Sequence, residues 1–236
     1  MKAIASTVKL HLNLREYTFV VPLSITGMVA AISVLISLIF MRSGSVPGSA
    51  EWIYGSQANP GILYALAGFL VYMGVASVAT TFPFALSLGA TRRAFVAGTL
   101  VWYAITAAYI AVILAVLAAI EVATGHWFAG FYIFDVNVLG AGDTGRLLTI
   151  VFLGVLSALT IGGVFGAAWI RFAARGPQLI AVGVVLTLAI LTIVIVPEAA
   201  AVFAAFRLWW LAVAAGVVIV LAATGSWLLL RPAIVR

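Results

Sequence analysis

Residues 80–99 read TTFPFALSLGATRRAFVAGT, and this stretch decides how the rest of the chain is organised. It carries Arg92 and Arg93, the only adjacent pair of like charges, between two long apolar runs. Pro83 lacks an amide hydrogen and disfavours helix at the residue before it, so the preceding helix is predicted to kink or end there. Gly89 then permits a change of direction. We expect a turn outside the lipid, with both guanidinium groups directed towards water or a carboxylate-bearing partner.

The composition identifies lipid as the main solvent of the chain. Of its 236 residues, 66% are hydrophobic and 8% are charged, and the mean hydropathy is +1.29. A soluble domain would carry roughly a quarter charged residues to cover its exterior. The net charge of +6 is spread too thinly for a nucleic-acid surface. The sequence therefore predicts an all-α polytopic membrane protein, a single domain over residues 1–236, with no nucleic-acid partner.

Six apolar runs are long enough to cross a hydrocarbon core of about 30 Å at 1.5 Å per residue. A short apolar piece after residue 198 is too short to cross, so a re-entrant helix is predicted between the fifth and sixth spans. Gly162 and Gly166 have the spacing that lets two helices approach closely. Residues 42–61 are expected to be a polar loop with Trp52 as an interface anchor. The six predicted spans cover about residues 19–40, 62–82, 95–120, 146–170, 179–196 and 208–230.

Residues 1–17 are predicted to form an amphipathic helix that lies in the membrane interface. A frayed terminus is the alternative. On a helical wheel most positions are apolar, but Thr7, His11 and Arg15 are exceptions. The polar wedge of the wheel contains Lys2, Ser6, Lys9, Asn13 and Glu16.

The charges orient the predicted spans. Six spans place both ends on one side of the membrane, and that side carries nine basic residues against Glu16 alone. The opposite side carries three basic and five acidic residues. By the positive-inside rule, the termini and the Arg92–Arg93 turn are expected in the cytoplasm of a plasma-membrane protein. The nine basic residues are Lys2, Lys9, Arg15, Arg92, Arg93, Arg171, Arg175, Arg231 and Arg236.

Several kinds of chemistry are excluded by residue type. The chain has no cysteine, so thiolate metal sites and cysteine nucleophiles are excluded. Its only lysines, Lys2 and Lys9, precede the first span, so no phosphate-binding Gly-x-x-x-x-Gly-Lys loop exists. His11 and His126 fall on opposite sides of the predicted membrane, which excludes a two-histidine metal site. We expect no catalytic residue, metal or cofactor on this chain, and no enzyme activity.

The second predicted span carries the best candidates for a substrate path. No charged residue is placed near the bilayer centre, which argues against an ion-coupled carrier with a carboxylate relay. A transported molecule would then meet hydroxyl and aromatic side chains. Such residues also serve simply to pack helices, which is the alternative. The candidates are Tyr64, Tyr72, Ser77 and Thr80.

The acidic residues of the outer loops have two interpretations. Glu121, Asp135 and Asp143 could form a cation or substrate site, but solvated loop carboxylates are the simpler expectation. Glu198 starts the short apolar piece, where a negative charge favours a helix N-terminus. It is a candidate outer gate, and helix capping is the alternative.

Together these features resemble the membrane subunit of ABC-2-type exporters, which are bacterial permeases paired with a separate ATPase. The most specific stretch is residues 88–95, LGATRRAF, preceded by FPF at 82–84. The residue-level likeness covers only about residues 82–99, and the likeness in architecture covers the whole chain.

The resemblance implies that the turn is a coupling helix seated on the ATPase, through Gly89, Thr91, Arg92 and Arg93. It further implies an ABC ATPase dimer that holds ATP and Mg, and a second permease subunit, identical or homologous. Spans two and five would then face a shared path for a hydrophobic or amphipathic substrate. No importer-type Glu-Ala-Ala motif lies on a predicted cytoplasmic loop, which favours export. A non-transporting membrane sensor or assembly partner is the alternative, and a membrane-embedded enzyme is a third hypothesis.

Overall fold

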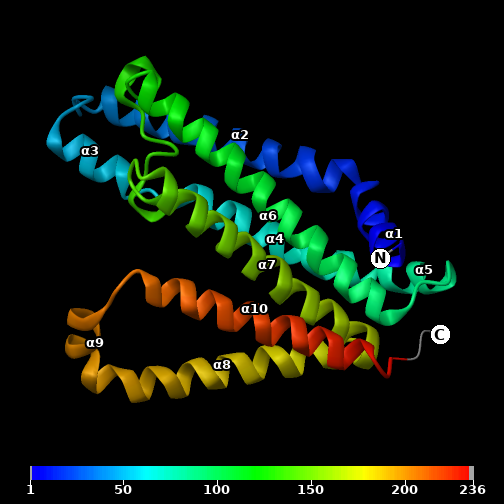
Figure 1. Cartoon of the computed structure of the whole chain (residues 1–236). Helices are drawn as coiled ribbons and strands as arrows, with labels where there is room; N and C mark the ends of the chain where they lie inside the picture. The colour runs from blue at the N-terminus through cyan, green and yellow to red at the C-terminus, as the bar shows by residue number, and fades with distance from the viewer. Residues whose placement is uncertain (1, 234–236) are drawn as a thin grey trace.

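The computed structural model describes residues 2–233, and every regular element in that range is a helix. Six helices are long and apolar enough to cross a membrane, which is compatible with a multi-pass membrane protein. They lie roughly along one another in an elongated bundle (Figure 1). The six are α2 (Val21–Arg42), α4 (Gly61–Ala79), α6 (Arg92–Ala123), α7 (Thr144–Phe172), α8 (Arg175–Ile195) and α10 (Trp209–Leu230).

The short helices gather at the two ends of this bundle (Figure 1). We call one the terminal end: it holds α1 (Lys2–Leu12), α5 (Thr81–Ser87) and the last turn of α10. The other, the loop end, holds α3 (Ala50–Gln57), the turn η2 (His126–Gly130) and α9 (Ala199–Ala205). An even number of long helices explains why α1 and the last turn of α10 lie at the same end.

Helix α4 ends before residue 82, the predicted end of the second span. Pro83 has no amide hydrogen to donate to the carbonyl four residues back, which is that of Ala79. Helix α4 accordingly ends at Ala79, and α5 starts at Thr81. Helices α6 and α7 extend beyond their predicted bounds. At the N-terminus of α6, the side chain of Thr91 accepts a hydrogen bond from the Ala94 amide. At the N-terminus of α7, the side chain of Asp143 accepts one from the Arg146 amide.

The predicted polar loop over residues 42–61 contains a helix, α3, that the sequence analysis did not expect. The helix starts where the Ser49 side chain accepts a hydrogen bond from the Trp52 amide at 3.2 Å. Trp52 is only 6% exposed, and its Nε1 donates to the Gly130 carbonyl at 2.7 Å. It therefore ties α3 to the loop after α6, whereas the sequence suggested an interface anchor.

Helices α4 and α7 cross in direct backbone contact. A Cβ added at Gly162 would lie 2.1 Å from the Val71 carbonyl oxygen, and one at Gly166 would lie 2.6 Å from that of Val75. From the opposite side, a Cβ at Gly74 would lie 2.3 Å from the Leu159 carbonyl oxygen. The predicted close approach at Gly162 and Gly166 is confirmed. Because no side chain separates the two backbones, this crossing fixes the centre of the bundle.

Residues 2–12 form the predicted N-terminal helix, but its packed face was not predicted. Thr7 and His11, two exceptions to the apolar pattern, are the buried residues of α1. His11 stacks on Trp102 with ring centroids 4.6 Å apart, and its Nε2 lies 3.0 Å from the Thr99 hydroxyl. Helix α1 is thus attached to α6 through polar and aromatic contacts. Its placement in a membrane interface stays a prediction.

Helix α8 has the least cover of the six long helices. Within residues 2–233 its most apolar window has no buried residue, and its closest neighbour is α7 near the terminal end. There, a Cβ at Gly176 would lie 2.3 Å from the Ala168 carbonyl oxygen. The chain then turns through the short helix η4 (Val196–Glu198) into α9. Re-entry of this piece into the membrane stays a prediction.

Candidate functional site

The four predicted coupling residues lie together at the terminal end. Gly89 has φ +82°, a left-handed conformation that side chains disfavour, and it reverses the chain after α5. Thr91 caps α6, as described above. The turn is exposed, and so are its apolar neighbours Phe84 and Leu88. The predicted turn is therefore present and exposed, and its position outside the lipid stays a prediction.

The two arginines of this turn differ in their surroundings. Arg92 donates through its guanidinium to the carbonyl oxygens of Arg231 and, at 2.8 Å, Ala233. These carbonyls lie beyond the last turn of α10, where helix geometry leaves acceptors unpaired. The expectation that both guanidinium groups face water or a partner is therefore wrong for Arg92. Arg93 is exposed and has no hydrogen-bond or ion-pair partner within residues 2–233.

A hollow of about 440 Å³ separates α1 from the turn after α5. Lys9 and Asn13 of α1 line one side, and Leu88 and Gly89 line the other. The hollow therefore lies between the predicted coupling turn and the N-terminal helix α1. Its lining combines one cation, an amide, two hydroxyl-bearing residues and apolar side chains, which suits a protein surface of mixed character.

The four candidate path residues on α4 do not form one site. Tyr64 and Tyr72 are 71% and 58% exposed and lie two helical turns apart on an open face of α4. Thr80 is also exposed, and its hydroxyl donates to the Ala76 carbonyl of its own helix. Ser77 is buried, and its hydroxyl lies 2.7 Å from the Tyr103 hydroxyl. Ser77 thus packs helices, which is the alternative considered for it.

Glu198, the candidate outer gate, is exposed at the end of η4 and directly precedes α9. No ion pair or hydrogen bond of its side chain is found within residues 2–233. It lies at the loop end of the bundle, and its gating role stays a prediction.

Glu121 was named as a candidate from the sequence, but its surroundings differ from those expected. The expectation of a solvated carboxylate is wrong, because Glu121 is fully buried at the end of α6. Its Oε1 accepts from the amides of Ile133 and Asp135, and its Oε2 accepts from the Phe134 amide and the Trp127 indole, at 2.8–3.0 Å. All four neighbours are donors, so the carboxylate form fits this site. Three of them are backbone amides, which leave no signal in the sequence.

The segment that Glu121 holds contains a strained turn. Gly125, His126, Trp127 and Phe128 all have φ between 59° and 64°, and left-handed conformation is unfavourable for the last three. His126 closes the turn: its Nε2 lies 3.0 Å from Asp135 Oδ2. Asp135 is only 8% exposed, which contradicts the solvated expectation. Asp143 is exposed, as expected, and caps α7.

Tyr132 emerges from this segment towards α3. The His126 ring stacks on the Tyr132 ring with centroids 3.9 Å apart. Burial, and then the charges of Asp135 and Glu121, raise the pKa of Tyr132 above its ordinary value. The phenol therefore stays protonated and can donate a hydrogen bond at neutral pH. No group of three metal-ligating side chains occurs in the described part of the chain.

Comparison with known proteins gives no match: no family model, no curated protein and no solved structure matches this chain.

Proposed function

We propose that this chain is the permease subunit of an ATP-driven exporter of the ABC-2 type. ATP and Mg would bind to a separate ATPase dimer, and a second permease subunit would complete the path. The proposal starts from the resemblance of residues 82–99 to the coupling segment of that family. It is consistent with six long apolar helices in a bundle that has α1 and the last turn of α10 at the same end.

The observation that carries the proposal is the surface at the terminal end. The protruding turn after α5, the exposed Arg93 and the hollow against α1 together offer a place where an ATPase could dock. Arg93 supplies a free cation that a carboxylate can pair with. Phe84 and Leu88 supply apolar area beside it. In the proposed orientation this end faces the cytoplasm, where the ATP is.

The contacts behind this surface would carry movement of the turn into the bundle. The turn continues directly into α6, to which α1 is attached through His11. Arg92 ties the same turn to the end of α10. Arg171 of α7 donates to the Leu228 carbonyl of α10 at 3.3 Å. A displacement at the turn would therefore be shared by α1, α6, α7 and α10.

The uncovered helices supply candidate walls for the path. Helix α4 exposes Tyr64 and Tyr72, and α8 is uncovered along its whole apolar window. A hydrophobic or amphipathic substrate could pass along such surfaces if a second subunit faced them. Membrane lipids would cover them otherwise.

Charge reversal at the turn tests the proposal. Arg93→Glu leaves the Arg92 contact to α10 intact, so the bundle should remain folded. We expect recovery of a co-expressed partner ATPase to fall about tenfold, which corresponds to about 1.4 kcal/mol. Arg175→Glu is the matched control, since Arg175 is equally exposed but lies at the start of α8.

Unchanged recovery with Arg93→Glu would contradict the docking surface. A complex that forms and hydrolyses ATP, but moves no amphipathic substrate in vesicles, would favour a sensor or assembly partner instead.

A further inference from the structure

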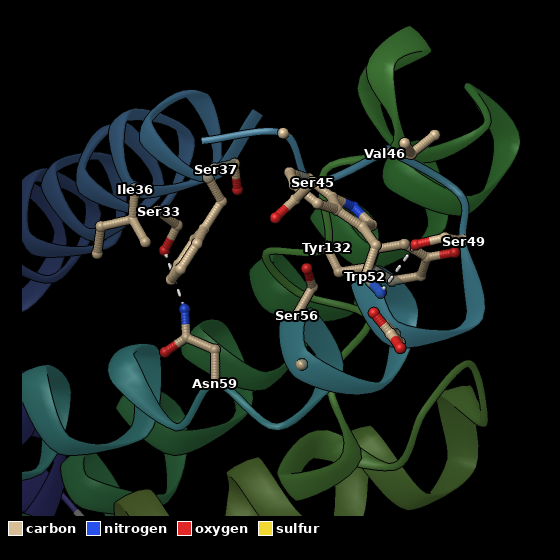
Figure 2. A pocket seen from close by; sticks show the side chains of 14 residues that line it. Ser33, Ile36, Ser37, Ser45, Val46, Ser49, Trp52, Ser56, Asn59 and Tyr132 are labelled. Carbon is tan, nitrogen blue, oxygen red and sulfur yellow. Dashed lines mark hydrogen bonds between the residues drawn. The ribbon is translucent and has the colours of Figure 1, made fainter. Parts of the chain in front are cut away.

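A cavity of about 580 Å³ lies at the loop end, between α2, α3 and the segment after α6. Its volume falls within the roughly 300–1,000 Å³ that is usual for small-molecule sites. Figure 2 shows Ser33, Ile36 and Ser37 on the α2 wall, across from Ser56 and Asn59, with Tyr132 also at the cavity. No predicted site residue lines it, so it is a separate site.

The polar lining of this cavity is rich in hydroxyl groups and poor in charge. Ser37, Ser45 and Ser56 line it, and their hydroxyls have no partner within residues 2–233. Glu51 is its only charged lining residue and is likewise unpaired. Each hydroxyl can both donate and accept, and the carboxylate accepts. Such a lining suits a ligand that itself carries several hydroxyl groups.

The absence of a cation among the lining residues excludes one large class of ligands. A phosphate or carboxylate headgroup would meet no Lys or Arg there, and it would lie near the charge of Glu51. Anionic lipids are therefore poor candidates, whereas an uncharged polyol loses no ionic solvation on entry.

The remaining lining residues are apolar or aromatic. Ile36 and Phe40 come from α2, a candidate membrane span, and are 45% and 54% exposed. An acyl chain could lie along that helix. Trp52 and Tyr132 contribute rings to the polar part of the cavity. The cavity thus joins a polar region to an apolar helix, which is the division found in an amphiphile.

The walls are fixed before any ligand arrives. Asn59 Nδ2 donates to the Ser33 hydroxyl at 3.3 Å, which joins the segment after α3 to α2. Trp52 is held to Gly130, and the Glu121 carboxylate holds the segment from which Tyr132 emerges. A preorganised site loses less conformational entropy on binding.

We propose that this cavity binds the uncharged, hydroxyl-rich headgroup of an amphiphile, such as a glycosyl lipid, with its acyl chain along α2. The serine hydroxyls, Asn59 and Glu51 hydrogen-bond the sugar, and the aromatic rings cover its apolar faces. Binding at this cavity, at the loop end, does not require an ATPase. The experiment below therefore tests this proposal independently of the proposed exporter function.

Gly55 offers a variant that fills the cavity without disturbing the fold. It lines the cavity within α3, and a Cβ there would meet no atom within 4 Å. Gly55→Leu should therefore occupy the site while favouring the helix. Gly68→Leu is the matched control: Gly68 is also helical and open, but it lies on α4 outside the cavity.

The assay uses the full chain in phosphatidylcholine nanodiscs that contain a photoreactive glucosyl diacylglycerol. We expect labelled peptides from α2, α3 and the Tyr132 segment, and competition by octyl glucoside. Gly55→Leu should lower labelling about tenfold and Gly68→Leu should not change it. Ser56→Ala, which adds no bulk, should lower it several-fold by removing a hydrogen bond to the sugar.

Three results would overturn the proposal. The first is labelling that maps outside the cavity walls. The second is labelling unchanged by both Gly55→Leu and Ser56→Ala. The third is better competition by a phosphatidylglycerol or an alkyl ammonium amphiphile than by octyl glucoside, which would assign the cavity to a charged headgroup.

Discussion

Replacing Glu121 by glutamine tests how the loop end is held together. Glutamine has almost the same shape, so no cavity is created. One oxygen, however, becomes an NH₂ group that faces two N–H donors. Either orientation of the amide thus loses two of the four hydrogen bonds and places like dipoles against each other.

The size of the effect follows from those two bonds. A hydrogen bond to a charged acceptor contributes about 1.5–3 kcal/mol, so losing two should destabilise the folded protein by about 3–6 kcal/mol. Part of this destabilisation should appear as a local change in the left-handed turn at residues 125–128. Once released, its three non-glycine residues would relax to ordinary backbone conformations.

Hydrogen–deuterium exchange in detergent is the assay. In Glu121→Gln, the amides of Ile133, Phe134 and Asp135 should exchange faster by more than a hundredfold, since about 3 kcal/mol is already a factor above one hundred. The control is Glu198→Gln, at an exposed acid without a partner, which should change nothing. Protection that stays at the wild-type level in Glu121→Gln would refute the argument.

Two further predictions concern the helix contacts. Gly162→Ala places a Cβ 2.1 Å from a carbonyl oxygen of α4, where ordinary contacts begin at 3.4 Å, and it should cost at least about 1–3 kcal/mol. Gly154→Ala on the same helix meets no atom within 4 Å and should leave the thermal midpoint unchanged or higher. A lower thermal midpoint for both variants would contradict the argument that the close approach of α4 and α7 causes the loss in Gly162→Ala. Burial lowers the pKa of His11 to about 4 from 6.5, so its neutral form stabilises the packing of α1 above pH 6.5. About 3 kcal/mol should be lost as the pH falls from 6.5 to 4, measured as faster exchange in α1; His11→Gln should show no such change in that window.

The positions of the long helices could be predicted from the sequence, and their ends only in part. Each span is an apolar run whose length the bilayer fixes, so local composition is enough to find it. The close packing at Gly162 was also readable, because small residues at that spacing have few other uses in such a helix. Helix α3 was missed because its start depends on one hydroxyl, that of Ser49, rather than on an apolar run.

The candidate sites show a sharper division. The protruding turn was readable from Pro83, Gly89 and the paired arginines, because backbone restrictions and charge are local properties. The sequence did not show which of the two arginines stays unpaired. Arg92 donates to carbonyl oxygens at the end of α10, some 140 residues later in the chain.

Glu121 and the loop-end cavity belong wholly to the tertiary structure. Every residue type except proline carries a backbone amide, so the sequence does not show that three of them surround the Glu121 carboxylate. From the sequence alone, this carboxylate cannot be distinguished from a solvated one. The cavity arises because α2 and α3 meet a segment distant in the chain, and its hydroxyls converge only there. The amino-acid order alone sets which long segments are apolar enough to cross a membrane, because that depends on local side-chain chemistry. Only the fold decided which polar groups meet one another, because hydrogen bonds depend on positions that distant segments set jointly.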